Sequence, residues 1–463
     1  MFISRRGFLG GLGASAVGAA GFTSLAASGR PGVSQGGSFA LLKRDPDAPV
    51  AADFDRLPLS WYKQTMQKLK DRVAAKGIKA ILLQNSLNIV HQTGLFHSST
   101  ERPFSVLVPT DADAIFWYHP GLDRDLVTSW WSTDSEYYFD YLHADGAFPN
   151  LGTVQQGATV DLWEWTLKGI KKRGFGEGVI GIDSELTPSA MATVQKVLPK
   201  AEIVNIAGDC LDLRIHKTPE EIALCQRAMD YFSKIHAFAR DLLLEKGTDL
   251  YDFDIGHAAV EYGMHLIMND IDVDGRPHKA VGIGVGVSCR SGIATGYPHP
   301  NQEYWKKIEK GDALQISGGV SIGGYGGECY RYYQLLPWDS HREKVWQVVT
   351  DCVKIQAEES KHGVTCSSVA YKIHKHQVKN GVGKLVYHRP AHGQGMEGHQ
   401  APWIAVGDYT MLEEGMTFSV EPGLYDPEHG FGYNPSDLLL VTKDRGLLMS
   451  SVPYTREWMV LNL

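Results

Sequence analysis

The segment Thr218-Pro219-Glu220-Glu221 constrains the fold most, because it marks the start of a long helix near the middle of the chain. Threonine is a preferred N-cap residue, and proline is favoured at the first helical position. Before this segment, helix-like and strand-like stretches alternate between Leu59 and Ala207. This alternation predicts an α/β layer domain over residues 53–207. At 463 residues, the chain is long enough for a second domain with its own core.

The second unit, residues 208–463, has a different pattern. After the helix at Thr218, the stretch DLYDFDIGHAAVEYGM (249–264) predicts another amphipathic helix. From Ala280 onward short strands dominate, and we expect two further helices at about residues 339–360 and 364–380. The pattern predicts an α+β domain with a curved antiparallel sheet.

The N-terminus resembles an export signal. Ser4-Arg5-Arg6-Gly7-Phe8-Leu9 is a twin-arginine pattern, and the stretch after it is apolar but too rich in small residues for a good membrane span. We expect a Tat-type signal at residues 1–28 and a Gly-, Ser- and Pro-rich linker at 29–52. The Tat export machinery is then a partner, and the protein is periplasmic or exported, or membrane-anchored if the leader is kept. A chance Arg-Arg pair is the alternative.

Bulk properties exclude some partners and leave others open. The formal net charge of −8 and a pI near 6.1 argue against broad binding of nucleic acid or anionic lipid. The six cysteines show no CxxC or zinc-ribbon spacing, so their pairing stays open.

Four stretches of the second unit carry a family resemblance. Together they resemble the pita-bread superfamily (peptidase family M24), which includes creatinase, aminopeptidase P and prolidase. The first unit resembles the creatinase/prolidase N-terminal domain, so the resemblance extends over about residues 53–455. It implies a pita-bread C-terminal domain and a homodimer. The stretches are SGIATGYPHP (291–300), GDALQISGGVSIGGYGGECYR (311–331), HRPAHGQGMEGHQAP (388–402), and LEEGMTFSVEPGLY (412–425) with GYNPSDLLLVT (432–442).

Peptidases of this family hold two divalent metal ions with two Asp, one His and two Glu. Residues 315–331 predict a hairpin, with a strand, a glycine turn and a second strand. The resemblance places the five ligand positions in this hairpin, the HGQGMEGH stretch, the EPG motif and the last strand. The residues at the five positions are Ser317, Glu328, His392, Glu421 and Ser436. Ser317 and Ser436 stand where the family has a carboxylate.

The two serines change the charge balance of the predicted metal site. Two carboxylates and one imidazole leave two adjacent divalent cations with excess positive charge, which costs several kcal/mol in a partly desolvated pocket. A serine hydroxyl is also a weak ligand. We therefore expect no intact dinuclear centre, and either no cofactor or one divalent ion on Glu328, His392 and Glu421. Strand alternation turns Asp437 away from Ser436, so Asp437 does not replace the lost ligand.

The resemblance also implies residues around the metal positions. His299 matches the histidine that contacts substrate and shuttles protons, and His399 matches the one that steadies the scissile carbonyl. Arg331 matches an arginine beside the hairpin carboxylate. In a neighbouring subunit, Arg102 and His97 could reach the cleft.

Creatinase provides the metal-free precedent within the superfamily. A histidine with an ordinary pKa near 6.5 can take and give a proton at neutral pH, which suits C–N hydrolysis. Under this hypothesis His299 is the acid and base, while Glu421 and Glu328 bind a cationic group or orient water. His392 and His399 complete the catalytic set. The substrate-binding set is Ser317, Glu328, Arg331, Ser436 and Arg102.

Other interpretations stay open for His299, Glu328 and Cys329. His299 could be structural in its Pro-His-Pro turn, and Glu328 could simply pair with Arg331. Cys329 could be a nucleophile, although alternation turns it away from the face of Glu328.

Three classes of function compete. The first is a metal-independent or single-metal hydrolase of a C–N bond in a small amino-acid-like or short-peptide substrate. The second is an Xaa-Pro metallopeptidase with adapted ligands, and the third is a non-catalytic binding relative. A lyase on a small sulfonium or carboxylate substrate is a variant of the first. The retained histidines favour the first class.

Overall fold

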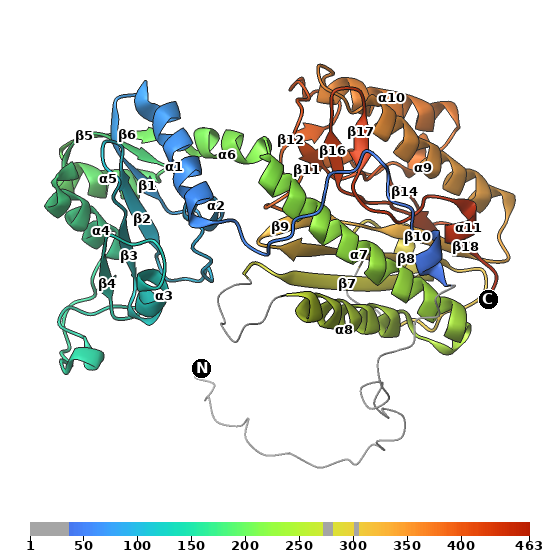
Figure 1. The fold of residues 1–463 in the computed structure, drawn as a ribbon, viewed down its shortest axis with the longest axis horizontal. Helices are drawn as coiled ribbons and strands as arrows, with labels where there is room; N and C mark the ends of the chain where they lie inside the picture. The colour runs from blue at the N-terminus through green and yellow to red at the C-terminus, as the bar shows by residue number, and fades with distance from the viewer. Residues whose placement is uncertain (1–36, 272–280, 301–304) are drawn as a thin grey trace, which may run out of the picture.

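The computed structural model describes residues 37–271, 281–300 and 305–463. These residues form two units, with the N-terminal unit on the left of Figure 1 and the C-terminal unit on the right. The leader expected at residues 1–28 lies outside the described residues. Within the described ranges, no helix combines the length and apolarity needed to cross a membrane.

The N-terminal unit is a six-stranded mixed sheet with helices on both faces, as the alternating pattern predicts. Successive residues of its central strand point to opposite faces. Ile81 packs in the core beneath one helical layer, and Leu82 packs in the core beneath the other. The strands, in sheet order, are β4 (Asp134–Tyr138), β3 (Phe116–Pro120), β2 (Ser105–Pro109), β1 (Ile78–Leu83), β5 (Glu177–Ile182) and β6 (Lys200–Asn205). The helices are α1 (Leu59–Ala74), α2 (Ser86–Thr93), α3 (Arg124–Thr128), α4 (Leu162–Ile170), α5 (Pro188–Val197) and α6 (Ala207–Ile215).

The helix start predicted at Thr218 is confirmed. The Thr218 hydroxyl accepts a hydrogen bond from the Glu221 amide, and the Glu221 carboxylate accepts one from the Thr218 amide, so the two residues form a capping box. This cap begins α7 (Pro219–Lys246), which packs with α8 (Asp252–Asp270) against one sheet of the C-terminal unit. The two later helices also form, as α9 (Ser340–Glu359) and α10 (Cys366–Lys379), and a short α11 spans Arg456–Met459.

The C-terminal unit contains two largely antiparallel sheets and a two-stranded ribbon. The first sheet has the order β18 (Val460–Leu461), β10 (Arg331–Leu335), β8 (Ala313–Ile322) and β7 (Gly284–Ser291), with β9 (Tyr325–Glu328) paired to β8. The second has the order β12 (Gln400–Ile404), β11 (Ala391–Gly393), β13 (Thr417–Phe418), β16 (Leu439–Val441) and β17 (Gly446–Leu448). The ribbon pairs β14 (Leu424–Asp426) with β15 (Phe431–Tyr433). Backbone hydrogen bonds between Tyr330 and Ser436 join the two sheets.

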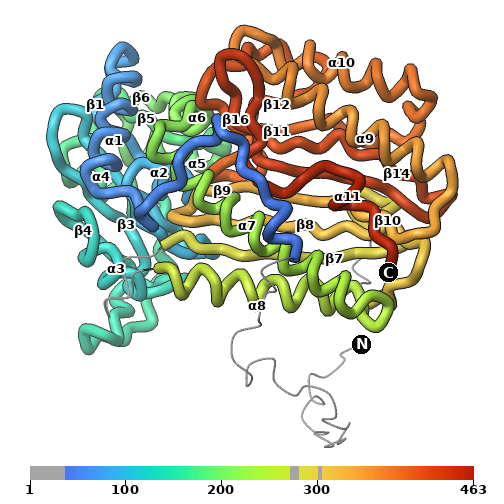
Figure 2. The backbone as a smooth tube through the Cα atoms, turned by 45° about the vertical axis from the view of Figure 1, so that its right-hand side comes forward, coloured from blue at the N-terminus to red at the C-terminus, as the bar shows by residue number. Residues whose placement is uncertain are grey.

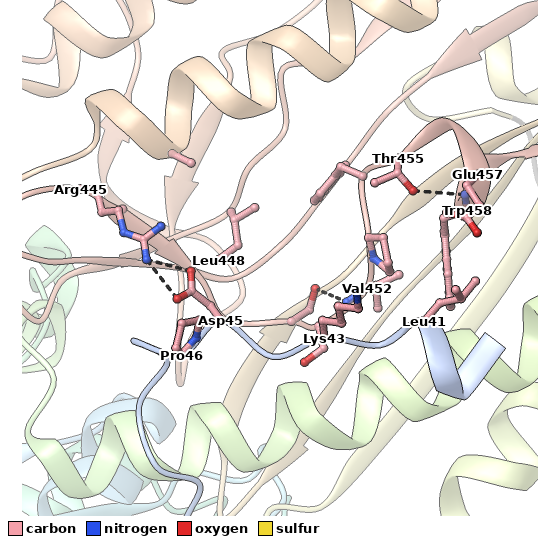
Figure 3. A pocket seen from close by; sticks show the side chains of 16 residues that line it. Leu41, Lys43, Asp45, Pro46, Arg445, Leu448, Val452, Thr455, Glu457 and Trp458 are labelled. Carbon is pink, nitrogen blue, oxygen red and sulfur yellow. Dashed lines mark hydrogen bonds and ion pairs between the residues drawn. The ribbon is translucent and has the colours of Figure 1, made fainter. Parts of the chain in front are cut away.

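Residues 37–52, the described part of the expected linker, form a strap on the C-terminal unit. The strap follows α7 in Figures 1 and 2. The Ser38 amide donates to Asp241 at 2.9 Å, and the Ala52 amide donates to the Ala223 carbonyl at 2.9 Å. Figure 3 shows Arg445 paired with Asp45 beside a cavity of about 550 Å³ between the strap and residues 445–458. This part of the linker is therefore attached along its length.

Buried polar contacts link the two units near the HGQGMEGH stretch. Arg214 of α6 bonds Asn88 of α2, whose amide bonds Asp183 at 2.9 Å. Arg214 also pairs with Glu397 of the HGQGMEGH stretch at 2.9 Å. The N-terminal unit therefore contacts the loop that carries the candidate histidines. All six cysteines are buried and unpaired.

Candidate functional site

The hairpin of β8 and β9 presents Glu328 to the second sheet. Ile322 pairs with Tyr325 across the turn, and the two intervening residues, Gly323 and Gly324, have φ values of +61° and +82°. Two positive φ angles in a two-residue hairpin define a type I′ turn, which glycine adopts without steric cost. This explains the glycine-rich sequence and places Glu328 at the end of β9.

His392 lies at the centre of the site. Its Nε2 is 3.0 Å from the Glu421 Oε2 and 3.9 Å from the Glu328 Oε2. Its Nδ1 lies 3.2 Å from the Gly393 carbonyl oxygen, which fixes the ring orientation. The side chain is only 2% exposed, and Nε2 makes no well-aligned hydrogen bond within the described residues. The buried Nε2 of His392 therefore faces two carboxylates.

The other two histidines line the open side of this cluster. The exposed His399 ring stacks on His392, with ring centroids 3.7 Å apart and an interplanar angle of 16°. His299 is exposed in its turn and close enough to lower the pKa of His399, although burial is the larger cause of that lowering. The structure thus stacks His399 on His392, and it places His299 close enough for its charge to contribute to the lowered pKa of His399.

The three central groups have unequal proton affinities. Burial and the Glu421 charge raise the pKa of Glu328 from 4.5 to about 7. Burial alone would raise the pKa of Glu421, but His392 outweighs it and lowers this pKa. Burial opposes charge on His392, yet Glu421 and Glu328 raise its pKa above the ordinary value. Glu421 and His392 therefore form an ion pair, and Glu328 is partly protonated near neutral pH.

Ser317 and Ser436 take different places. The Ser317 hydroxyl lies 3.0 Å from the Ser288 hydroxyl on the neighbouring strand β7. The fully buried Ser436 places its hydroxyl 3.5 Å from the Glu328 Oε2. Neither adds negative charge to the cluster.

The donor set does not fit the dinuclear centre implied by the family resemblance. Two carboxylates and an imidazole cannot balance two adjacent divalent cations, and the serine hydroxyls are occupied or weak donors. A single ion fits better, because Glu328, His392 and His399 each offer an atom within 4.8 Å of the others. These three residues would hold one ion, with Glu421 beside His392. This corrects the expected set, in which Glu421 stood in the place of His399.

Arg331 corrects two expectations. It is completely buried and pairs with Asp437 at 2.7 Å, and its guanidinium lies 3.7 Å from the centroid of the Tyr454 ring. It therefore stabilises the core and neither contacts substrate nor pairs with Glu328. The predicted orientation of Asp437, away from the face of Ser436, is confirmed by the same ion pair. Cys329 is likewise buried on this core side, and its thiol accepts a hydrogen bond from Arg331.

The group of Glu328, His392, His399 and Glu421 is called the catalytic cluster below. Arg102 lies in the N-terminal unit and outside this cluster. Its Nε donates to Asp140 at 2.6 Å, and its Nη1 pairs with Glu101 at 2.8 Å. His97 stacks on Phe104 with ring centroids 4.3 Å apart. A role for either residue in a neighbouring subunit's cleft stays a prediction.

Three residues of the site lie outside the sequence prediction. Tyr330 hydrogen-bonds the Glu328 carboxylate, and the Gln394 side chain accepts from the Glu328 amide at 3.3 Å. Arg290 donates to the Pro298 carbonyl at 3.1 Å and so holds the turn that carries His299. Tyr330 lies within the stretch 311–331 and Gln394 lies within HGQGMEGH, so a place inside a motif was the available signal.

Replacing Glu328 with Gln should change the pH dependence of stability. The folded state binds the Glu328 proton more tightly than the unfolded chain, so this stabilisation is present below pH 4.5 and lost as pH rises through about 7. With EDTA present, we expect Glu328→Gln to reduce the wild-type stability loss between pH 5 and pH 8 by about 1–3 kcal/mol. Urea unfolding at both pH values measures this. The exposed substitution Glu202→Gln on β6 should leave the wild-type dependence intact. An identical dependence in Glu328→Gln would contradict the raised pKa.

Comparison with known proteins finds a matching family model for each unit. The sequence profile of metallopeptidase family M24 matches residues 223–443, and that of the creatinase/prolidase N-terminal domain matches residues 65–216. Together the two matches extend over most of the chain. The hairpin, HGQGMEGH and EPG stretches all lie within the M24 match, and the two matches confirm the two-domain interpretation.

The similarity to known relatives extends over most of the chain. A putative dipeptidase, YkvY, of Bacillus subtilis (strain 168) is 22% identical over 392 residues, covering 84% of this chain and 98% of that protein. An Xaa-Pro dipeptidase of Lactobacillus helveticus is 27% identical, covering 82% and 94%. The crystal structure of prolidase from Thermococcus sibiricus superposes with a TM-score of 0.69 at 21% identity, covering 86% and 99%. The likeness to prolidase confirms the pita-bread fold.

Proposed function

We propose that the chain is an exported hydrolase of a C–N bond in a small amino-acid-like or short-peptide substrate, using histidine acid–base chemistry without an intact dinuclear metal centre. The match to the metallopeptidase M24 model supports the hydrolase class. The proposal of histidine acid–base chemistry without a dinuclear centre rests on the residues of the catalytic cluster. His392 lies against Glu421 and near Glu328, while Ser317 and Ser436 stand where the resemblance implies carboxylate ligands.

The carboxylates supply binding and orientation. Glu421 holds His392 in place through the 3.0 Å contact, and Tyr330 and Ser436 both reach the Glu328 carboxylate. When Glu328 loses its proton, the cluster carries a net negative charge, which favours a cationic amine or amidine of the substrate, since charge interactions strengthen as water is excluded. A water molecule bound to Glu328 would be oriented by the same bonds.

The exposed histidines supply proton transfer. His299 is held by the Arg290 contact to Pro298, and its imidazole is free to approach substrate. A neutral imidazole accepts a proton from the attacking water, and the resulting imidazolium donates that proton to the leaving amine. His399, stacked on His392, lies where it can donate to the carbonyl oxygen of the bond being cleaved.

A cavity next to Glu328 suits a small substrate. Its volume is about 610 Å³, within the usual range for small-molecule sites. Its walls include Gly284, Gly286 and Gly319, where the lack of side chains leaves space and exposes backbone hydrogen-bonding groups.

Replacing His299 with Ala tests the acid–base assignment. We expect a fall in kcat of about 10²–10⁴-fold, with a smaller change in KM, because the imidazole acts on the bond and not on ground-state binding. Steady-state kinetics on N-substituted amino acids, amidines and short peptides measures this. The matched variant His362→Ala, an exposed histidine beyond α9, should keep wild-type kcat. Unchanged turnover in His299→Ala would refute the assignment.

A metal-dependent Xaa-Pro dipeptidase is the second candidate. The names of relatives such as the Lactobacillus helveticus enzyme support it. The fit of Glu328, His392 and His399 to one ion supports a mononuclear form of it. This candidate requires that chelation abolishes turnover.

We also propose Tat-dependent export and a homodimer. The twin-arginine pattern at residues 4–9 supports export, and the resemblance to creatinase-type proteins supports the dimer. Cell fractionation of wild-type and Arg5→Lys/Arg6→Lys protein, and light scattering on the purified chain, test the two proposals.

A further inference from the structure

A second group of metal-binding side chains lies outside the catalytic cluster. His341 is near the start of α9, Asp426 ends β14, and His429 lies in the turn between β14 and β15. The ribbon lies beside α9 in both Figure 1 and Figure 2. These three residues form the His–Asp–His cluster.

The geometry of the cluster suits a metal ion. His341 Nε2 is 2.7 Å from Asp426 Oδ2, and His429 Nδ1 is 2.9 Å from Asp426 Oδ1. One candidate atom of each residue lies within 4.8 Å of the other two. Bonds from Zn²⁺ to imidazole nitrogen or carboxylate oxygen are about 2.0–2.2 Å, so neighbouring ligand atoms lie about 3 Å apart. A bound ion would therefore need only small side-chain movements.

Hydrogen bonds hold the β14–β15 turn together and connect it to α9. The Asp426 carboxylate accepts from the His429 amide at 3.2 Å, and Gly430, with φ of +69°, completes the turn. Arg342 of α9 donates to the His429 carbonyl at 3.0 Å. Because the turn and helix are held in register without an ion, binding requires little ordering of the chain.

Exposure and charge leave the site accessible to a cation. The side chain of Asp426 is 5% exposed, whereas those of His341 and His429 are 42% and 61% exposed. Asp339 and Glu428 add negative potential around His429. Solvent can reach the open side, where water would complete the coordination.

We propose that His341, Asp426 and His429 form a non-catalytic site for one Zn²⁺ or similar imidazole-preferring divalent ion. Two imidazoles and one carboxylate favour Zn²⁺ over Mg²⁺ or Ca²⁺, which prefer sets made of oxygen alone. The ion would clip the β14–β15 ribbon to α9. Since β14 follows Glu421 after two residues, the clip would also restrain the segment leading to the catalytic cluster.

Zinc stoichiometry tests this proposal. Wild-type protein and His429→Gln, His341→Gln and His362→Gln variants are dialysed against micromolar Zn²⁺, and bound zinc is measured by mass spectrometry. We expect His429→Gln and His341→Gln to bind one equivalent less than wild-type and His362→Gln protein. Equal binding by all four would overturn the proposal. His392→Ala should lose zinc independently of His429→Gln if the catalytic cluster also binds an ion, so the two sites are distinguishable.

A second measurement does not depend on the variants. Zn²⁺ should raise the Tm of wild-type protein and protect His429 from acylation by diethyl pyrocarbonate, read out by peptide mass spectrometry. The same Tm rise with Mg²⁺, or unprotected His429 at saturating Zn²⁺, would contradict the assignment.

Discussion

Replacing His392 with Ala should lower kcat/KM by at least about 10³-fold. The ring contacts Glu421, stacks on His399 and lies near Glu328, so its loss disorganises binding and proton transfer together. The substitution also leaves Glu421 without its cationic partner in a site where the carboxylate side chain is only 14% exposed. We expect the pKa of Glu421 to rise as a result.

His374→Ala provides a matched control. This histidine lies on α10 and hydrogen-bonds Gln377 at 2.8 Å, outside the catalytic cluster. Its removal should change kcat/KM by less than about threefold. Wild-type turnover in His392→Ala, with any of the substrates that the wild-type protein cleaves, would place the activity elsewhere on the molecule.

Replacing Arg331 with Met should lower the free energy of unfolding by about 3–5 kcal/mol, the usual cost of leaving one partner of a buried ion pair alone. Arg331 and Asp437 are both completely shielded from solvent. The guanidinium also donates to the Val452 carbonyl at 2.6 Å and the Tyr454 hydroxyl at 2.8 Å. Urea unfolding with EDTA present measures the change.

Two comparisons separate the buried charge from general loss of packing. Arg456→Gln breaks an exposed ion pair with Glu343 and should cost less than about 1 kcal/mol. The double variant Arg331→Met/Asp437→Leu should be more stable than Arg331→Met, because it removes the stranded carboxylate. A cost below about 1 kcal/mol for Arg331→Met would contradict the structural role given to Arg331.

Local patterns predicted the elements and much of the site. The cap at Thr218 and the Gly323-Gly324 turn depend on neighbouring residues, so their structures follow from short stretches. His392, His399 and Glu421 were found because each lies in a long motif with a family resemblance. The same reasoning placed Asp437 on the face opposite Ser436, since side chains alternate along a strand.

The partner of Arg331 could not be predicted in this way. Glu328 is near in sequence, but the arginine pairs with Asp437 in the segment that precedes β16. The His–Asp–His cluster shows the same limit, because His341 and Asp426 meet only where α9 packs beside the ribbon. Contacts between distant segments depend on how sheets and helices pack, which a single sequence does not specify locally.

Metal content measured on active protein tests the central claim most directly. The chain is purified without added metal or chelator, its metal equivalents are determined by mass spectrometry, and the same sample is assayed before and after EDTA. We predict at most one equivalent at the catalytic cluster, counted in His429→Gln protein, with turnover largely retained after chelation. Two equivalents at that cluster, with turnover abolished by EDTA and restored by Mn²⁺ or Zn²⁺, would contradict the account and establish an adapted dinuclear peptidase.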